Sequence, residues 1–178
     1  MEDITIRKAT DDDLPVVLNL IKFYIYDMSK STGWDCNSQG IFDGCDDSRE
    51  YWQRRHRDTD ERNRWDETVK GHPFMIESGT GFAGFVLIKE FIEDQNTDYD
   101  VGEFFITGKY QSRGIGQYVA RSIFNRLKGR WSVRQLKSNT PARKFWEKII
   151  SEYTNDEYEI SEIESDGYEM IFLTFNNS

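Results

Sequence analysis

Residues 101–129 read VGEFFITGKYQSRGIGQYVARSIFNRLKG and predict a strand, a glycine-bearing loop and a helix in succession. The strand is expected at residues 101–107. The helix is expected to begin near Ile115, because apolar side chains recur from there at every fourth position. It ends near Gly129, a residue type that commonly follows the last turn of a helix. The unpaired N–H groups of a helix start therefore come directly after the loop.

The loop in this stretch suits a phosphate group, because anions bind at the positive end of a helix dipole. Gly114 and Gly116 have no Cβ to keep an anion away from the backbone, and Arg113 adds a positive charge beside them. The dinucleotide motif is incomplete, since Val119 stands where its third glycine belongs, and the Gly-Lys-Ser/Thr of a P-loop is absent. A phosphate-bearing ligand that is held in another way is therefore indicated.

The segments on either side of this stretch predict an α/β (α+β) fold. Alternating apolar residues indicate strands, and apolar residues at helical spacing beside capping residues indicate helices. The expected strands lie at residues 4–8, 74–77, 82–89 and 131–136 and in a final hairpin around Asp166-Gly167, and the expected helices begin at Thr10, near residue 51, and at Asn139 or Thr140. We expect one domain over residues 1–178, with a mixed, largely antiparallel central sheet flanked by helices.

Charge is distributed unevenly along the chain. The formal net charge is −9, yet residues 108–150 contain 11 Lys and Arg against a single acid, Glu147. Residues 151–178 contain 8 acids and no base. Acidic flanks would repel a long nucleic-acid backbone, whereas a compact polyanion suits one basic block. Nucleic acid is therefore not an expected partner.

The composition also indicates a cytoplasmic protein without a membrane partner. No apolar run approaches the roughly 18 to 20 residues that a membrane helix needs, and the chain starts Met1-Glu2-Asp3 rather than with a signal peptide. Cys36 and Cys45 have no further Cys or His nearby to complete a zinc site. Residues 35–46 match the spacing of a calcium loop only imperfectly, so no metal site is expected.

Two motifs resemble the GNAT superfamily of N-acetyltransferases. Gln111-Ser112-Arg113-Gly114-Ile115-Gly116 is similar to the family's phosphate loop, which has Gln or Arg first, Gly fourth, and Gly or Ala sixth. Residues 139–146, NTPARKFW, are similar to the start of a later family helix that begins with Asn. The resemblance covers nearly the whole chain, and it matches closely at residues 101–150.

The resemblance implies acetyl-CoA (coenzyme A) as the cofactor. Its pyrophosphate would be held by the N–H groups of residues 111–116, its pantetheine arm would pair along the fourth strand, and an Asn side chain would bond to the arm or to a nearby backbone group. The implied cofactor-binding residues are Phe104, Phe105, Ile106, Gln111, Ser112, Arg113, Gly114, Ile115, Gly116 and Asn139.

Two carboxylates are candidates for the catalytic base. An amine must be neutral to attack a thioester, so the site needs a base and also donors for the oxyanion. The resemblance implies a base early in the fourth strand, where Asp100 is the positional match. Strand alternation turns Glu103 to the opposite face unless a bulge intervenes, so both residues stay candidates. The expected oxyanion donor is the N–H of Phe105 or Ile106.

One position departs from the family. Trp146 stands where many members have the Tyr that is thought to protonate the leaving thiolate, and indole cannot act as a general acid near neutral pH. Tyr110, Tyr118 or solvent would have to replace it. The expected function is acetyl transfer to a primary amine of a small molecule or peptide. A cofactor-binding regulatory module with little turnover is the alternative.

The acceptor is expected to be cationic, possessing one or more ammonium groups. The remaining cavity walls would come from residues 20–70 and the tail, which are acidic and rich in aromatic residues, and these features favour a polycation. The aromatic residues concerned are Phe23, Tyr24, Tyr26, Trp34, Tyr51, Trp52 and Trp65. The alternative is that acidity only provides solubility and that the aromatic side chains belong to the core.

Overall fold

The computed structural model describes residues 3–42, 46–52, 69–79, 81–92, 94, 96–165 and 167–178. Within these residues the strands form one 7-stranded sheet in the order β1-β2-β3-β4-β5-β7-β6. The strands are β1 (Ile4–Lys8), β2 (Val69–Ser78), β3 (Gly81–Phe91), β4 (Tyr99–Ile106), β5 (Arg130–Leu136), β6 (Glu159–Ser165) and β7 (Tyr168–Asn176). The α-helices are α1 (Leu14–Thr32), α2 (Ile115–Arg126) and α3 (Thr140–Thr154), and short 3-10 turns occupy Asp11–Asp13, Asp46–Tyr51 and Gly108–Tyr110.

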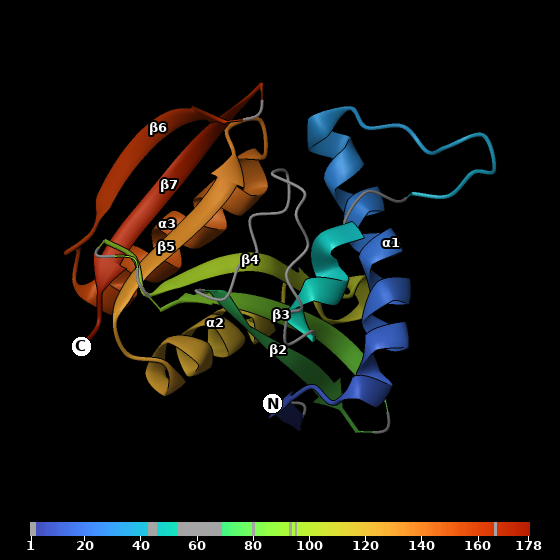
Figure 1. Ribbon diagram of the computed structural model, residues 1–178, viewed down its shortest axis with the longest axis horizontal. Helices are drawn as coiled ribbons and strands as arrows, with labels where there is room; N and C mark the ends of the chain where they lie inside the picture. Colours follow the sequence, from blue (N-terminus) through green and yellow to red (C-terminus); the bar gives the residue numbers. More distant parts are fainter. Residues whose placement is uncertain are drawn as a thin grey trace.

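The predicted mixed, largely antiparallel sheet is confirmed. Neighbouring strands are antiparallel throughout, except that β4 and β5 run parallel. The parallel contact is short and consists of Tyr99 opposite Trp131, Asp100 opposite Ser132 and Val101 opposite Val133. Figure 1 shows α1 at one side of the molecule and α3 with β5, β6 and β7 at the other.

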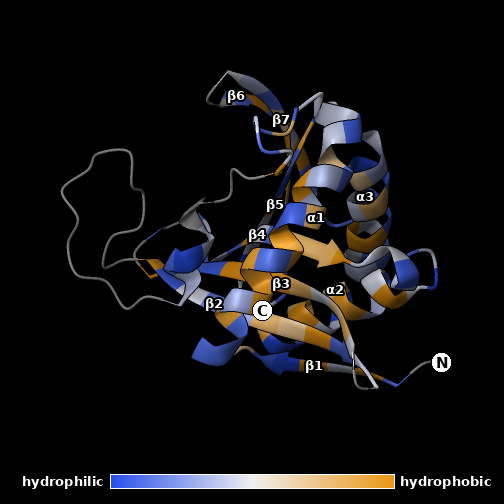
Figure 2. Ribbon diagram, turned by 90° about the vertical axis from the view of Figure 1, so that its right-hand side faces the viewer, coloured by the Kyte–Doolittle hydropathy of each residue, from blue (hydrophilic) through white to orange (hydrophobic). Residues whose placement is uncertain are grey.

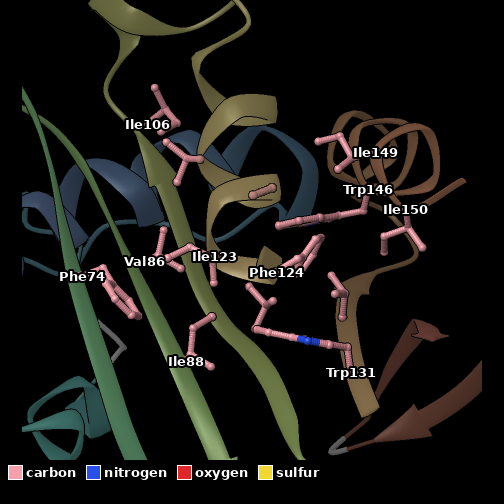
Figure 3. Close-up of a cluster of buried hydrophobic side chains, with 14 of the residues drawn as sticks. Phe74, Val86, Ile88, Ile106, Ile123, Phe124, Trp131, Trp146, Ile149 and Ile150 are labelled. Carbon is pink, nitrogen blue, oxygen red and sulfur yellow. The ribbon is translucent and has the colours of Figure 1, made fainter. Parts of the chain in front are cut away.

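Both faces of the sheet bury apolar side chains. Helices α2 and α3 pack on one face, where the ring of Phe124 lies 4.9 Å from that of Trp131 and 6.4 Å from that of Trp146. Figure 3 shows these rings between the two helices and the strands. Helix α1 packs on the other face through Val17, Ile21 and Ile25. Residues 83–88 of β3 are buried from both sides, and Figure 2 shows this apolar strand in the interior.

Most predicted elements are confirmed, and their bounds differ by a few residues. The strands of the first hairpin are longer than expected, because β2 and β3 pair from Val69 opposite Phe91 to Ser78 opposite Gly81. Thr10 caps the 3-10 turn at Asp11–Asp13 rather than α1, which begins at Leu14. The final hairpin is confirmed as β6 and β7. Of the helix expected near residues 51–65, only Tyr51 and Trp52 lie within the described residues, Tyr51 at the end of a 3-10 turn.

An ion pair fastens the end at which β4 and β5 are joined. Asp98 precedes β4, and its carboxylate accepts hydrogen bonds from the backbone N–H of Arg130 at 2.7 Å and from that residue's guanidinium at 2.7 and 3.0 Å. These donors stabilise the ionised form and lower the pKa of Asp98 to about 2. There is no room for a side chain at Gly129, because a Cβ there would lie 2.7 Å from Asp98 Oδ2.

This pair predicts a pH-dependent contribution to stability. Because folding lowers the Asp98 pKa, the contribution is fully present above the unfolded pKa of about 3.9 and is lost as the pH falls through about 2. We expect Asp98→Asn to lower the unfolding temperature near neutral pH. The difference from wild type should shrink as the pH falls toward 2.

Thermal unfolding followed by circular dichroism over this pH range measures the difference. Asp12→Asn, at an exposed position of the first 3-10 turn, is the control and should change little. A difference between Asp98→Asn and wild type that does not vary with pH would contradict the assignment.

Candidate functional site

A cavity of about 1140 Å³ opens where β4 and β5 part. Residues 101–106 of β4 and residues 134–136 of β5 form its two sides. The loop before α2, the start of α3, α1 and β7 complete its lining. Beyond Val101 and Val133 the two strands no longer pair, so their facing backbone groups border the cavity instead of a neighbouring strand. A ligand could therefore pair with β4 as a strand would.

A β-bulge in β4 decides which carboxylate faces the cavity. Leu87 of β3 pairs with Glu103 and Ile88 with Val101, so Gly102 is the extra residue. A Cβ at Gly102 would overlap the hydroxyl of the buried Tyr51, and only glycine fits there. The bulge puts Glu103 on the same face of β4 as Asp100, the face toward α1. Simple alternation predicts that Asp100 and Glu103 lie on opposite faces of β4, and this prediction is wrong because of the bulge.

Glu103 lines the cavity, and Asp100 is not among the described residues that do so. Asp100 is 4% exposed and lies behind the cavity, where β4 and β5 are still paired. Its Oδ1 lies 3.4 Å from Nη2 of Arg134, which is its ion-pair partner. Burial raises the pKa of Asp100, and the positive charges of Arg134 and Lys89 oppose that rise. The geometry gives Glu103 access to a ligand and gives Asp100 a supporting position.

The predicted phosphate loop has the backbone conformation of an anion-binding turn. Ser112 and Gly114 both have positive φ, 59° and 78°, immediately before α2 begins at Ile115. Backbone N–H groups that converge in such a turn, at a helix N-terminus, suit a phosphate. Because Ile115 is buried in the core, it can offer only its backbone N–H.

Gln111 holds this loop to the end of β4. Its side-chain Nε2 donates to the carbonyl of Ile106 at 2.7 Å and to Asp27 of α1 at 3.3 Å. Ser112, Gly114 and Gly116 line the cavity, as Gln111 also does, whereas Arg113 is exposed and is not among the lining residues. The loop therefore reaches the ligand through its backbone and its small residues.

The start of α3 forms the end of the cavity beside this loop. Asn139 is the N-cap of α3, and its Oδ1 accepts a hydrogen bond from the N–H of Ala142 at 3.2 Å. It also lines the cavity, so the capping role and a ligand contact are compatible. Phe104 lines the α3 side of the cavity, with its ring 5.0 Å from that of Trp146. Phe105 and Ile106 complete the β4 wall.

Tyr110 and Tyr118, the two candidates to replace the missing phenol, are not among the described residues that line the cavity. Tyr110 is buried under the loop, and Tyr118 is 47% exposed on α2. Trp146 does line the cavity and is 6% exposed. The phenols among the described lining residues are those of Tyr24 in α1 and Tyr168 in β7. Sequence reasoning could not identify these two tyrosines as alternatives, because both lie far from the two motifs in the chain.

The aromatic residues expected around an acceptor divide into wall and packing residues. Tyr24 and Trp34 line the cavity, and the ring of Trp34 lies 6.4 Å from that of Tyr168, another lining residue. The others in the described part of the chain do not line it. Phe23 is exposed, and Tyr26 packs on Phe42. Tyr51 is buried in the core on the α1 face, and the indole N–H of Trp52 donates to the carbonyl of Thr10. Trp65 lies outside the described residues.

Charges of both signs reach the described wall. Asp27 and Glu103 are acidic, and Lys30 and Arg134 are basic. Lys30 donates to Asp27 at 3.0 Å, so these two largely neutralise each other. In β5, Gln135 also lines the cavity, and both of its side-chain amide atoms are buried with no hydrogen-bond partner among the described residues. Sequence reasoning missed Arg134 and Gln135, because no motif marks the residues at which β5 leaves β4.

The described residues contain no group of three or more His, Cys, Asp or Glu placed to hold a metal ion. The loop at residues 35–46, considered for calcium, lies partly outside them. Among the described helices, none is both long enough and apolar enough to cross a membrane.

Comparison with family models identifies one family. The model of the acetyltransferase (GNAT) family matches residues 41–150. No curated protein sequence matches the chain. Among solved structures, an acetyltransferase from Thermus thermophilus superposes with a TM-score of 0.64 at 13% identity, covering 99% of both chains.

Two further solved structures resemble this fold over nearly their whole length. Aminoglycoside acetyltransferase AAC(6')-Ib, in complex with coenzyme A and kanamycin, gives a TM-score of 0.62 at 12% identity and covers 98% of this chain and 95% of its own. The ribosomal-protein-S18-alanine N-acetyltransferase from Escherichia coli gives 0.59 at 12% identity and covers 98% and 94%. At these identities the likeness shows the fold.

The loop geometry predicts that a side chain at Gly116 weakens the binding of coenzyme A. A Cβ there would lie 3.0 Å from the ring of Phe145, at the edge of the cavity, and the rest of a valine side chain would occupy space beside the N–H groups. We expect Gly116→Val to raise the dissociation constant of coenzyme A at least tenfold, measured by isothermal titration calorimetry.

Gly108→Val is the matched control, since nothing lies within 4 Å of a Cβ at Gly108 and the residue is not part of the described wall. An unchanged affinity in a Gly116→Val protein with a normal unfolding temperature would reject the loop as the phosphate site.

Proposed function

Because the chain belongs to the GNAT family of acetyltransferases, we propose that it transfers the acetyl group of acetyl-CoA to a primary amine in the cavity between β4 and β5. The observation that carries this proposal is the parting of the two strands beyond Val101 and Val133, into a cavity that continues to the glycine loop at residues 111–116. One end suits phosphate and the middle offers unpaired strand backbone. The other end is open to a second substrate.

The residues present fit acetyl-CoA. The positive φ values at Ser112 and Gly114 and the free N–H groups at the start of α2 form a cradle for pyrophosphate. The edge of β4 from Glu103 to Ile106 is unpaired on the β5 side and can bond the amide groups of a pantetheine arm. When bound, acetyl-CoA supplies an activated thioester carbonyl. The N–H of Phe105 or Ile106 is the proposed donor to the oxyanion.

We assign the general base to Glu103. Its carboxylate lines the cavity beside the β4 bulge, where it can take a proton from an incoming ammonium group, directly or through a water molecule. Asp100 is buried behind this position and holds an ion pair with Arg134, so its proposed role is to position that side chain. This assignment chooses between the two carboxylates that the sequence left open.

The leaving thiolate needs no protein acid in this proposal. Trp146 lines the cavity but cannot give up its indole proton near neutral pH. Tyr110 and Tyr118 are not among the described wall residues. Solvent that enters through the open mouth of the cavity is the proposed proton source.

A cofactor-binding module with little turnover is the second candidate function. The indole at position 146 favours it, because the phenol that many family members use is missing there. Release of free thiol in the presence of an amine distinguishes the two. A catalyst releases thiol over many turnovers, whereas a binding module retains acetyl-CoA unchanged.

The acceptor is proposed at the level of a primary amine, in a small molecule or a peptide. Glu103 can attract an ammonium group, and Tyr24 and Trp34 can contact it through their ring faces. The described wall carries two basic side chains as well, so its charge does not single out a polycation. A polycationic acceptor, a cytoplasmic location and a single domain over residues 1–178 stay predictions from the sequence.

The assignment of the base predicts a large effect of Glu103→Gln. Loss of a general base typically lowers the rate about 100-fold or more, so kcat should fall by that order while the KM for acetyl-CoA changes only a few-fold. The rise of kcat with pH should also flatten, because the group that must lose a proton is gone. Steady-state thiol release across a pH series measures both effects.

Asp100→Asn is the matched variant and should retain more activity than Glu103→Gln. The opposite order would transfer the role to Asp100. Normal kcat in both variants would reject a carboxylate base on β4.

A panel of amines tests both the activity and the polycation prediction. We expect thiol release and an N-acetylated product with at least one of a polyamine, an aminoglycoside, an amino acid, an amino-acid amide and a peptide with a free N-terminus. If the polycation prediction holds, the polyamine or aminoglycoside has the highest kcat/KM and loses the most when salt is added, because salt screens charge attraction.

A neutral or anionic amine with the highest kcat/KM would contradict the polycation prediction and leave the activity standing. The absence of product with every amine, while coenzyme A still binds, would favour the binding module.

A further inference from the structure

Arg134 is a loosely engaged basic residue in the described wall of the cavity. An arginine side chain carries five N–H donors. None of them makes a hydrogen bond to a described residue, and the ion pair with Asp100 is made through one nitrogen at 3.4 Å. Charge-assisted hydrogen bonds are usually about 2.7 to 2.9 Å long. The guanidinium therefore has donors to spare.

Structural arginines in the same protein look different. Arg7 donates to both carboxylate oxygens of Asp13 at 2.6 and 2.8 Å. Arg130 does the same to Asp98 at 2.7 and 3.0 Å. Arg134 does not saturate its carboxylate partner in this way, although Asp100 is almost fully buried beside it.

The position of Arg134 is that of a ligand contact. It is the first residue of β5 beyond the last pair with β4, and it lies opposite Phe172 of β7. Its side chain is 33% exposed, and both Arg134 and Phe172 line the cavity. An apolar neighbour and partial burial strengthen a charged contact, because less water competes for the guanidinium.

The charge pattern around Arg134 suits an anion with a single charge. Of the two basic residues in the described wall, Lys30 donates to Asp27 at 3.0 Å, whereas Arg134 makes no hydrogen bond to a described residue. A doubly charged phosphate would call for more positive charge than this. A carboxylate matches the planar fork of an arginine with two parallel hydrogen bonds.

The ammonium and the carboxylate would belong to one small molecule. Glu103, the proposed base, lies two residues beyond Val101, and Arg134 lies one residue beyond Val133, on the strands that part at that pair. Both residues line the cavity, so the two groups face the same space. Tyr24, Trp34 and Phe172 supply apolar surface around it.

We propose that Arg134 binds the carboxylate of the acceptor, and that the acceptor is an amino carboxylate with an apolar or aromatic side chain. This inference rests on the proposed acetyl transfer to an amine and specifies its substrate class. Asp100 then keeps the guanidinium in place, and Glu103 receives the proton of the amine.

Matched pairs of acceptors test the proposal. Phenylalanine and phenylalaninamide, methionine and methioninamide, and tryptophan and tryptophanamide differ only in the carboxylate. We would measure kcat/KM for each member in wild type, in Arg134→Gln and in Arg121→Gln. Arg121 is the control, because it is an exposed α2 residue paired with Glu152, outside the described wall.

Arg134→Gln should reduce kcat/KM for at least one carboxylate at least tenfold more than for its amide. Comparing the two losses cancels the difference in amine pKa between an acid and its amide. Arg121→Gln should affect both members of a pair equally. An equal loss for acid and amide in Arg134→Gln would show that the residue only neutralises Asp100, and would overturn the proposal.

A binding measurement separates this inference from the activity itself. We would titrate N-acetylphenylalanine, N-acetylmethionine, N-acetyltryptophan and their amides into protein saturated with coenzyme A, using calorimetry. Binding of an acid that Arg134→Gln weakens tenfold more than binding of its amide supports the site, whether or not turnover is seen. If no acid binds or reacts, the inference fails, while thiol release with other amines would leave the proposed function intact.

Discussion

The short parallel contact between β4 and β5 is the constraint on which the rest of the structure depends. Three residue pairs join the strands, and beyond Val101 and Val133 they separate. The ion pair of Asp98 with Arg130 fastens the joined end, and α2 and α3 pack across both halves of the sheet so that the open end keeps its shape. Separated strands leave backbone groups that a ligand can pair with, and a fully paired sheet would have none.

The sequence predicts the glycine loop and the start of α3 from local signals. A glycine-bearing loop between a strand and an amphipathic helix, and an Asn before a helix that opens with Pro, depend on neighbours within a few residues. The structure places Gln111, Ser112, Gly114, Gly116 and Asn139 along the cavity, as those patterns suggest. The mixed sheet follows from the same local patterns and is confirmed.

The acceptor half depends on contacts between distant segments, which no local pattern records. The bulge at Gly102 brings Glu103 to the same face of β4 as Asp100. The hydroxyl of Tyr51, a residue distant in the sequence, occupies the space that a Cβ at Gly102 would need. Arg134 faces the cavity only because β5 has left β4 one residue earlier. Tyr24 and Phe23 are neighbours in sequence, yet the helix turns one into the wall and the other to solvent.

The contact between Trp34 and Tyr168 lies in the wall of the cavity and joins two segments far apart in the chain. Neither belongs to residues 101–150, which contain the strand edge, the glycine loop and the start of α3. Substitutions at these two positions can therefore reshape the cavity wall without altering the residues of that stretch. Descendants of one ancestral enzyme could diverge in substrate range in this way, and exchange of these two segments offers a route to altered selectivity in the laboratory.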